Sequence, residues 1–209
     1  MAKFTDETIT TARLISFSDG VFAIAVTLLV FNLKVPQIPL AGAHRNLPGM
    51  VVAMLPHFTV YFLSFFVIAI YWTFHHRLMN LVIRMDTRFL WMNIWYLSVI
   101  AFIPFPTALF GAYPNEAFSF VFYICSMILV GIFSMLMLGY ASYKYRLVSK
   151  ELPVLIVKYL FFRQLITIFV FLTAIPLAFY HLYWARYYLF IVFPLNWIGR
   201  RYFKRFLGN

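Results

Sequence analysis

Six long apolar runs dominate the sequence, and they restrict the possible folds more than any other feature. A membrane-spanning helix needs about 20 mostly apolar residues. We interpret every run as a helix, because an isolated strand in lipid would leave its backbone N–H and C=O groups unpaired. The six runs are Leu14–Val35, Met50–His76, Phe89–Phe110, Ala117–Tyr140, Leu155–Tyr180 and Trp184–Ile198. The predicted fold is an all-α integral membrane protein with six transmembrane helices.

The composition supports a membrane protein and argues against a soluble domain. Hydrophobic residues make up 64% of the 209 residues, and charged residues make up 11%. A soluble domain is nearer half apolar and a quarter charged, and a chain of this length cannot bury so much apolar surface in one aqueous core. We therefore expect a single six-helix domain over residues 1–209, in a multi-pass protein of the cell membrane.

The basic residues indicate how the chain is oriented in the membrane. The net charge is +11, which on its own would also suit nucleic-acid binding, but these residues lie between the apolar runs and form no interleaved patch. Only Lys34, Arg45 and Arg186 lie in three of the connections. The termini and the other two connections carry Lys3, Arg13, Arg77, Arg84, Arg88, Lys144, Arg146, Lys150, Lys158, Arg163, Arg200, Arg201, Lys204 and Arg205. Because cytoplasmic segments are enriched in Lys and Arg, both termini are predicted to be cytoplasmic, with no nucleic-acid partner.

Asp19 lies inside the first apolar run, where an ionised side chain is costly. A carboxylate at the centre of a spanning helix costs about 2.5–3.5 kcal/mol on insertion scales, so it needs a partner and suggests a function. Side chains that can donate to a carboxylate follow on the second and third runs. The predicted partners are Trp72, His76 and Asn80, which share one helical face, and Asn93; His75 and Arg77 flank them. The alternative is that the histidines are interfacial and bonded to water.

The first run also carries an apolar stripe that points away from Asp19. At about 100° per residue, Ile24, Leu28 and Phe31 fall within about 60° of one another, and Asp19 projects more than about 100° from Ile24. Phe17 lies on the same stripe and Thr27 at its edge. The two faces therefore have different neighbours. The stripe could face a symmetry axis, or it could pack against adjacent helices.

Residues on the first three runs resemble the signature of a known family. The first run reads Arg13-x-x-x-Phe17-Ser18-Asp19-Gly20, then Val-Phe-Ala-Ile-Ala, and after one further residue Thr27-Leu28-Leu29. The second run contains Tyr71-Trp72 and His75-His76, and the third contains Asn93 and Pro104-Phe105. This pattern resembles the transmembrane protein 175 family, and the resemblance covers the whole six-helix unit.

The resemblance implies a potassium-selective channel of the kind found in endolysosomes, with shorter prokaryotic relatives that assemble as homotetramers in the lipid bilayer. The family's pore is lined by the first helices and lacks the Thr-Val-Gly-Tyr-Gly filter of other potassium channels, a motif that this sequence also lacks. Carried over to this chain, the apolar constriction layers fall on Ile24, Leu28 and Phe31, with Thr27 close by. Arg13, Ser18 and Asp19 match the family's polar network. Phe31 is bulkier than the leucine expected at the last layer.

Two other classes of function compete with a channel. A secondary transporter of a cation or small solute is the main alternative, although transporters usually show paired broken helices around a midplane polar site. An enzyme is not expected, because no His-Glu-x-x-His or comparable motif occurs. The single cysteine, Cys125, allows no intrachain disulfide and no zinc-binding spacing. We expect no cofactor and no resident metal, with potassium only as the permeating ion.

Overall fold

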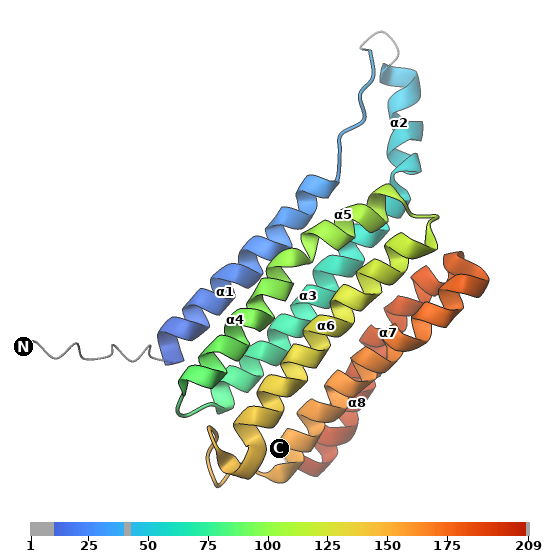
Figure 1. The fold of residues 1–209 in the computed structure, drawn as a ribbon. Coiled ribbons are helices and arrows are strands. Elements are labelled where there is room, and N and C mark those ends of the chain that lie inside the picture. The colour runs from blue at the N-terminus through green and yellow to red at the C-terminus, as the bar shows by residue number, and fades with distance from the viewer. Residues whose placement is uncertain (1–10, 40–42, 208–209) are drawn as a thin grey trace, which may run out of the picture.

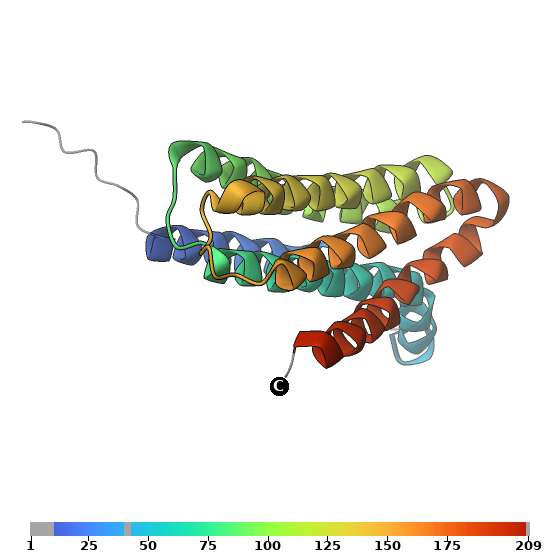
Figure 2. The same cartoon turned by 90° about the horizontal axis from the view of Figure 1, so that it is seen from below.

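The computed structural model describes residues 11–39 and 43–207, and side chains as far as Phe203. Lys3 therefore lies outside the described residues, as do the side chains of Lys204 and Arg205. The described chain is a bundle of long helices (Figures 1 and 2). Its elements are α1 Thr11–Leu28, η1 Leu29–Asn32, α2 Ala43–Ala53, α3 Leu55–Leu81, α4 Thr87–Phe102, α5 Pro104–Ala112, α6 Ala117–Ser142, η3 Tyr143–Tyr145, α7 Val154–Tyr188, η4 Leu189–Ile191 and α8 Val192–Leu207.

Five helical stretches of the described chain are long and apolar enough to cross a membrane: Thr11–Asn32, Leu55–Leu81, Thr87–Ala112, Ala117–Tyr145 and Val154–Phe203. The last contains a reversal at His181, whose φ of −149° and ψ of 83° leave the helical region. Figure 2 shows the chain turning back there, so that α8 returns beside α7. The predicted all-helical, multi-pass membrane fold is confirmed, and the last two predicted runs are the two limbs of this hairpin.

The first run ends as a helix earlier than predicted. The α-helix stops at Leu28, one 3₁₀ turn follows to Asn32, and the backbone is extended from Leu33. A 3₁₀ turn is a common helix ending because it pairs carbonyls that would otherwise lack donors. Leu33 N donates to Val30 O at 3.0 Å, and the Asn32 amide donates to Pro104 O at 3.2 Å. The last predicted residues, to Val35, are therefore a connection.

Proline explains the other differences from the predicted runs. Met50, the predicted start of the second run, belongs to the separate helix α2, which projects from one end of the bundle (Figure 1). Pro56 lies in the first turn of α3, where its missing N–H is tolerated. The third run divides between α4 and α5 at Pro104, because a proline cannot continue the hydrogen-bond ladder of a helix.

Buried aromatic side chains hold the helices together, and their hydroxyls are paired. Tyr71 donates to Met127 O at 2.7 Å, and Tyr96 donates to Tyr71 O at 3.3 Å. Both tyrosines are fully buried, so an unpaired hydroxyl on either would be costly. At Gly131 on α6, an added Cβ would come within 2.7 Å of Ile168 on α7. Glycine therefore permits the close approach of these two helices.

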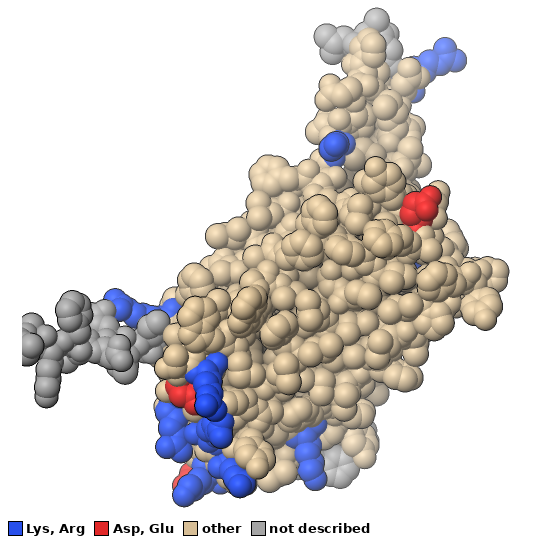
Figure 3. Space-filling view, viewed as in Figure 1, with Lys and Arg blue, Asp and Glu red and all other residues tan. Residues whose placement is uncertain are grey.

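Both ends of the described chain lie at the same end of the bundle, and the basic residues gather there. Figure 1 places the start of α1 and the end of α8 at this end. On the face shown in Figure 3, Lys and Arg side chains cluster there, while the middle of the bundle shows almost none. At the same end, Asp86 caps α4 by accepting from Phe89 N at 2.8 Å and from the Tyr140 hydroxyl at 2.6 Å. Burial opposes ionisation of Asp86, but these bonds and the charges of Arg146 and Arg88 hold its pKa below the usual value.

Candidate functional site

The first helix has a buried face and an exposed face. Leu14, Ser18, Phe22, Ala25 and Leu29 are buried against the bundle. The other face carries the predicted stripe: Ile24 is 60% exposed, Leu28 41% and Phe31 76%, and Phe17 and Thr27 are exposed beside them. The Thr27 hydroxyl donates to the carbonyls of Ala23 and Ile24, both at 2.9 Å, so it is bonded to its own helix. An apolar face therefore runs along α1 that no element of the described residues 11–39 and 43–207 covers.

A chain of buried hydrogen bonds ties the other face of α1 to α3 and α4. The Ser18 hydroxyl donates to Leu14 O at 2.8 Å and accepts from the Asn93 amide at 3.1 Å. The Asn93 carbonyl oxygen lies 2.7 Å from His75 Nε2, which fits a histidine protonated at Nε2. The His75 ring stacks on Tyr96, with ring centroids 5.3 Å apart and planes 4° apart. Three helices are thus joined through one satisfied polar chain.

Asp19 lies at the edge between the two faces and has a different partner. Its Oδ1 accepts from Trp72 Nε1 at 2.8 Å. The Trp72 ring stacks on His76, with centroids 5.4 Å apart, and His76 Nε2 lies 3.1 Å from the Asn80 amide nitrogen. Asp19 is half-buried in a groove of about 380 Å³ between α1 and α3, lined mainly by apolar side chains such as Phe65. A carboxylate in such a setting is stabilised by the indole N–H that faces it.

The predicted polar residues therefore fall into two groups. Asp19, Trp72, His76 and Asn80 form an outer line, while Ser18 and Asn93 belong to the buried chain. Arg13 lies exposed in the first turn of α1. His75, which the sequence placed only beside the predicted partners, supplies the buried link between Ser18–Asn93 and α3. His75 shares a helical face with Tyr71 and Leu78, and the structure shows that this face is the buried one.

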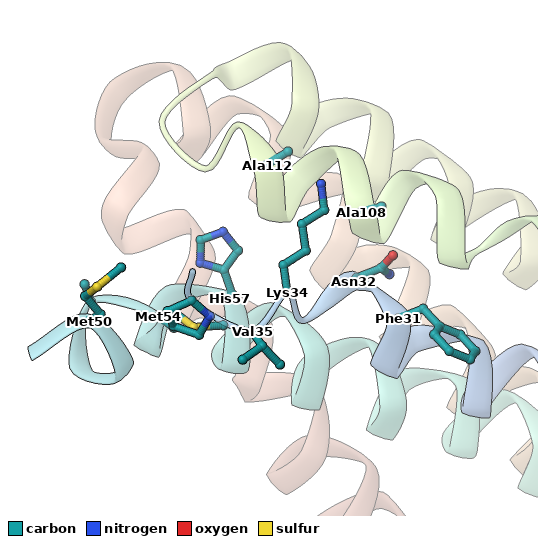
Figure 4. Close-up of a pocket in the computed structure, with 11 residues that line it drawn as sticks. Phe31, Asn32, Lys34, Val35, Met50, Met54, His57, Ala108 and Ala112 are labelled. Carbon is teal, nitrogen blue, oxygen red and sulfur yellow. The ribbon is translucent and has the colours of Figure 1, made fainter. Parts of the chain in front are cut away.

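A cavity of about 660 Å³ opens at the opposite end of the bundle, where the segment after α1 passes α2, α3 and α5 (Figure 4). Lys34 extends across it toward Ala112, and His57 lies beside it on α3. Phe31 stands at its border, so the cavity adjoins the last residue of the exposed stripe. Within the described ranges, no group of three His, Cys, Asp or Glu side chains could hold a metal ion.

The comparisons with known proteins agree on one family. Residues 13–104 match the sequence model of the family described as endosomal/lysosomal potassium channel TMEM175. A potassium channel of Chamaesiphon minutus is 42% identical over 103 residues, which are 49% of this chain and 50% of that protein. A potassium channel of Streptomyces collinus is 40% identical over 104 residues, 50% of this chain and 49% of that protein. The alignments thus span about half the length of these curated relatives.

More distant similarity extends over the rest of the chain. The human endosomal/lysosomal proton channel TMEM175 is 25% identical over 142 residues, 67% of this chain and 27% of that protein. The crystal structure of a lysosomal potassium-selective channel TMEM175 homolog from Chamaesiphon minutus matches the fold with a TM-score of 0.76 and 27% identity, covering 93% of this chain and 98% of that chain. The sequence match thus centres on the helices that carry the α1 site, and the structural match includes the remaining helices. Residues 13–104 of this chain are therefore similar to the TMEM175 family, and the described chain shares the fold of a TMEM175 homolog.

Proposed function

We propose that the chain forms a potassium-selective channel whose pore is lined by α1 of each subunit. The observation that carries this proposal is the exposed stripe of Ile24, Leu28 and Phe31 on a helix whose other face is fixed by buried hydrogen bonds. A pore-lining helix needs one face held by its own subunit and one face free for the axis. The names of the relatives as potassium channels support the choice of ion.

The stripe would act as a barrier rather than as a set of ion ligands. A narrow apolar ring removes water from a cation without replacing it, so such a ring can close a pore by dewetting. In the proposed channel, Ile24 forms the tightest layer, Leu28 and Phe31 form further layers, and Thr27 lies close by. Asp19 and the buried chain through Ser18 and Asn93 hold α1 in place outside the conduction path.

A stripe on one helix encloses a path only when several copies surround an axis. We propose a homotetramer, in which four α1 helices meet, because closed cyclic symmetry is the usual arrangement of identical subunits. The exposed stripe is then covered by equivalent stripes. A protomer alone would present Ile24, Leu28 and Phe31 to lipid and offer no aqueous path.

The substitution Ile24→Asn tests the pore assignment. Polarity at a hydrophobic barrier lowers the cost of hydration, so we expect a larger potassium current or weaker discrimination against sodium, with an intact oligomer. The matched control is Val30→Asn, because Val30 is also exposed but lies in the 3₁₀ turn after α1 and is not part of the stripe of Ile24, Leu28 and Phe31.

The measurement is bilayer recording of both purified variants under potassium, sodium and proton gradients, with the elution volume of each oligomer. Ohmic single-channel steps separate a channel from a transporter, whose flux saturates. An intact Ile24→Asn oligomer with wild-type conductance and selectivity would refute the pore assignment. Loss of the oligomer in Ile24→Asn alone would show that the stripe only packs.

The gathering of basic residues at one end supports the proposal that both termini are cytoplasmic. A fluorescent reporter that folds only in the cytoplasm, fused after Asn209, should give a signal in intact cells. A dark fusion of normal abundance would contradict this orientation.

A further inference from the structure

Three arginines from three helices meet at the end of the bundle that holds both chain ends. Arg163 on α7 donates from Nη2 to the Thr73 hydroxyl on α3 at 2.9 Å and from Nε to Asn196 Oδ1 on α8 at 3.1 Å. Arg77 on α3 donates to the Tyr159 hydroxyl on α7 at a long 3.4 Å. The charges of Arg77 and of Arg200 on α8 both act on Arg163. We call Arg77, Arg163 and Arg200 the arginine cluster.

Arg163 is held rigidly at the centre of this cluster. The Thr73 hydroxyl donates its own proton to Ile70 O at 2.8 Å, which leaves its lone pairs for Arg163. The Asn196 amide nitrogen donates to Val192 O at 2.8 Å, which fixes the orientation of the Asn196 carbonyl. These two bonds use two of the five N–H donors of the guanidinium. Arg163 is half-buried, so its charge lies between helices rather than at the end of a mobile side chain.

Among the described residues, the charged side chains that act on Arg163 are both arginines. The four acidic residues of the described chain are Asp19, Asp86, Glu116 and Glu151, and none of them is among the groups that act on Arg163. Partly buried like charges repel one another and lose solvation, so their proximity is unfavourable unless an anion is bound. Guanidinium groups suit phosphate in particular, because their planar N–H pairs match its oxygens.

We infer that the arginine cluster binds the phosphate of an anion where hydrogen bonds link α3, α7 and α8 at this end of the bundle. The membrane supplies one such anion directly, as the headgroup of an anionic phospholipid in the leaflet at this end. The aromatic side chains beside the cluster fit that source, since Tyr159 and Phe162 each pack against Phe203, with ring centroids 5.0 and 5.6 Å apart, and would border an acyl chain. Inorganic phosphate in solution offers the arginines the same phosphate oxygens but has no acyl chain.

The alternative is a general attraction of basic residues to anionic lipid. The two explanations differ in whether the affinity for lipid depends on which arginines are removed. Surface attraction depends on the number of charges near the membrane, whereas a built site depends on which arginines are removed. Arg201 is the natural comparison, because it follows Arg200 on α8 but stacks over the Trp197 ring at 4.3 Å. Arg84, exposed in the connection between α3 and α4, is the counterpart of Arg77.

The test compares two double variants that each remove two charges from the same end. Arg77→Gln/Arg200→Gln alters the cluster and keeps the hydrogen-bonded Arg163, while Arg84→Gln/Arg201→Gln is the control. Phosphatidylglycerol and phosphatidylcholine are titrated onto each purified protein, and bound lipid is counted by native mass spectrometry. Each arginine near an anionic lipid contributes roughly fivefold in affinity, so the cluster variant should bind phosphatidylglycerol about thirtyfold more weakly. The control removes as many charges from the same end, so any loss that it shows measures general attraction, and this loss should be much smaller than that of the cluster variant.

Other outcomes decide against part or all of the inference. Equal losses in the two double variants, or no loss in either, would overturn a built site. If phosphatidylglycerol binds no better than phosphatidylcholine, while inorganic phosphate raises the melting temperature of the wild type and not of the cluster variant, the ligand is free phosphate and the lipid assignment is wrong. Should the double variant fail to fold, Arg200→Gln alone must still lose roughly fivefold relative to Arg201→Gln. None of these readouts depends on ion conduction, so they stand apart from the channel proposal.

Discussion

The two faces of α1 differ in the opposite sense from those of a helix in a soluble protein. The buried face holds the polar chain through Ser18, Asn93 and His75, while the exposed face carries Ile24, Leu28 and Phe31. In water the polar face would be outside. In lipid or in a dewetted pore, no water is available to bond to polar side chains. Polar side chains are therefore stable only where they bond to one another inside the bundle. The buried face therefore fixes the helix, and the exposed face remains free to contact lipid or, in the proposed channel, to line the pore.

Breaking the buried face should have the largest effect on stability. Asn93→Leu keeps the approximate volume but leaves His75 Nε2 without its partner, and it removes the amide donor to Ser18, whose hydroxyl keeps only its bond to Leu14 O. Each unpaired buried group costs about 1–3 kcal/mol, and for a protein of this size each kcal/mol lowers the melting temperature by about 2–4 °C. We expect a drop of roughly 10 °C and poor recovery of the oligomer, measured by thermal unfolding in detergent.

The control for this substitution is Ser98→Ala on the same helix. Ser98 is exposed, and its hydroxyl donates only to Trp95 O, at 2.8 Å. Its loss should leave the melting temperature within about 1 °C of wild type, because surface changes rarely exceed a few tenths of a kcal/mol. Equal melting temperatures for Asn93→Leu and wild type would mean that the buried chain does not fix α1.

The sequence predicted the features of this protein that depend on apolar runs and helical periodicity, but not those that depend on how helices pack against one another. Spans and fold class depend on runs of apolar residues, which need no knowledge of neighbours. Helical periodicity likewise placed Ile24, Leu28 and Phe31 on a stripe away from Asp19, but it left open whether that stripe is exposed or packed against adjacent helices. The choice between His75 and His76 could not be made in this way, because adjacent residues point to different neighbours and only the packing of α3 against α4 decides which is buried. The break before Leu55 was missed because apolar sequence continues across it, whereas the reversal at His181 falls between the predicted runs Leu155–Tyr180 and Trp184–Ile198.

Asp19 lies on the border between the faces, so its loss should have an intermediate effect. Asp19→Ala removes the acceptor of the Trp72 indole N–H, and hydrogen bonds to charged groups contribute about 1.5–3 kcal/mol. Because Trp72 is itself partly exposed, we expect a smaller drop in melting temperature than for Asn93→Leu, together with reduced oligomer. Asp19→Asn retains an acceptor oxygen and should recover most of the loss.

Size-exclusion chromatography and bilayer recording together test the structural role of Asp19. If Asp19→Ala assembled normally and changed only the ion selectivity, the carboxylate would contribute to the conduction path, and the separation of the two faces would fail at this residue.

The smallest effect is expected at the far end of the exposed face. Phe31→Leu shortens a side chain that touches little of its own protomer, so the melting temperature should change by no more than about 1 °C. In the proposed pore, however, the change removes bulk from the last apolar layer in every subunit. The wider layer should raise the single-channel potassium conductance, by roughly twofold at most, because Ile24 remains the tightest barrier.

Phe118→Leu is the control for Phe31→Leu, since Phe118 is 74% exposed at the first turn of α6 and borders none of the stripe. It should leave the conductance unchanged. Equal conductance changes in the two variants would indicate a general response to altered packing in lipid. Unchanged conductance in Phe31→Leu, with Ile24→Asn still active, would confine the barrier to the Ile24 and Leu28 layers. A loss of the oligomer in Phe31→Leu would instead assign this end of the exposed face to contacts between subunits, because only a partner's surface could then depend on a side chain that its own protomer leaves uncovered.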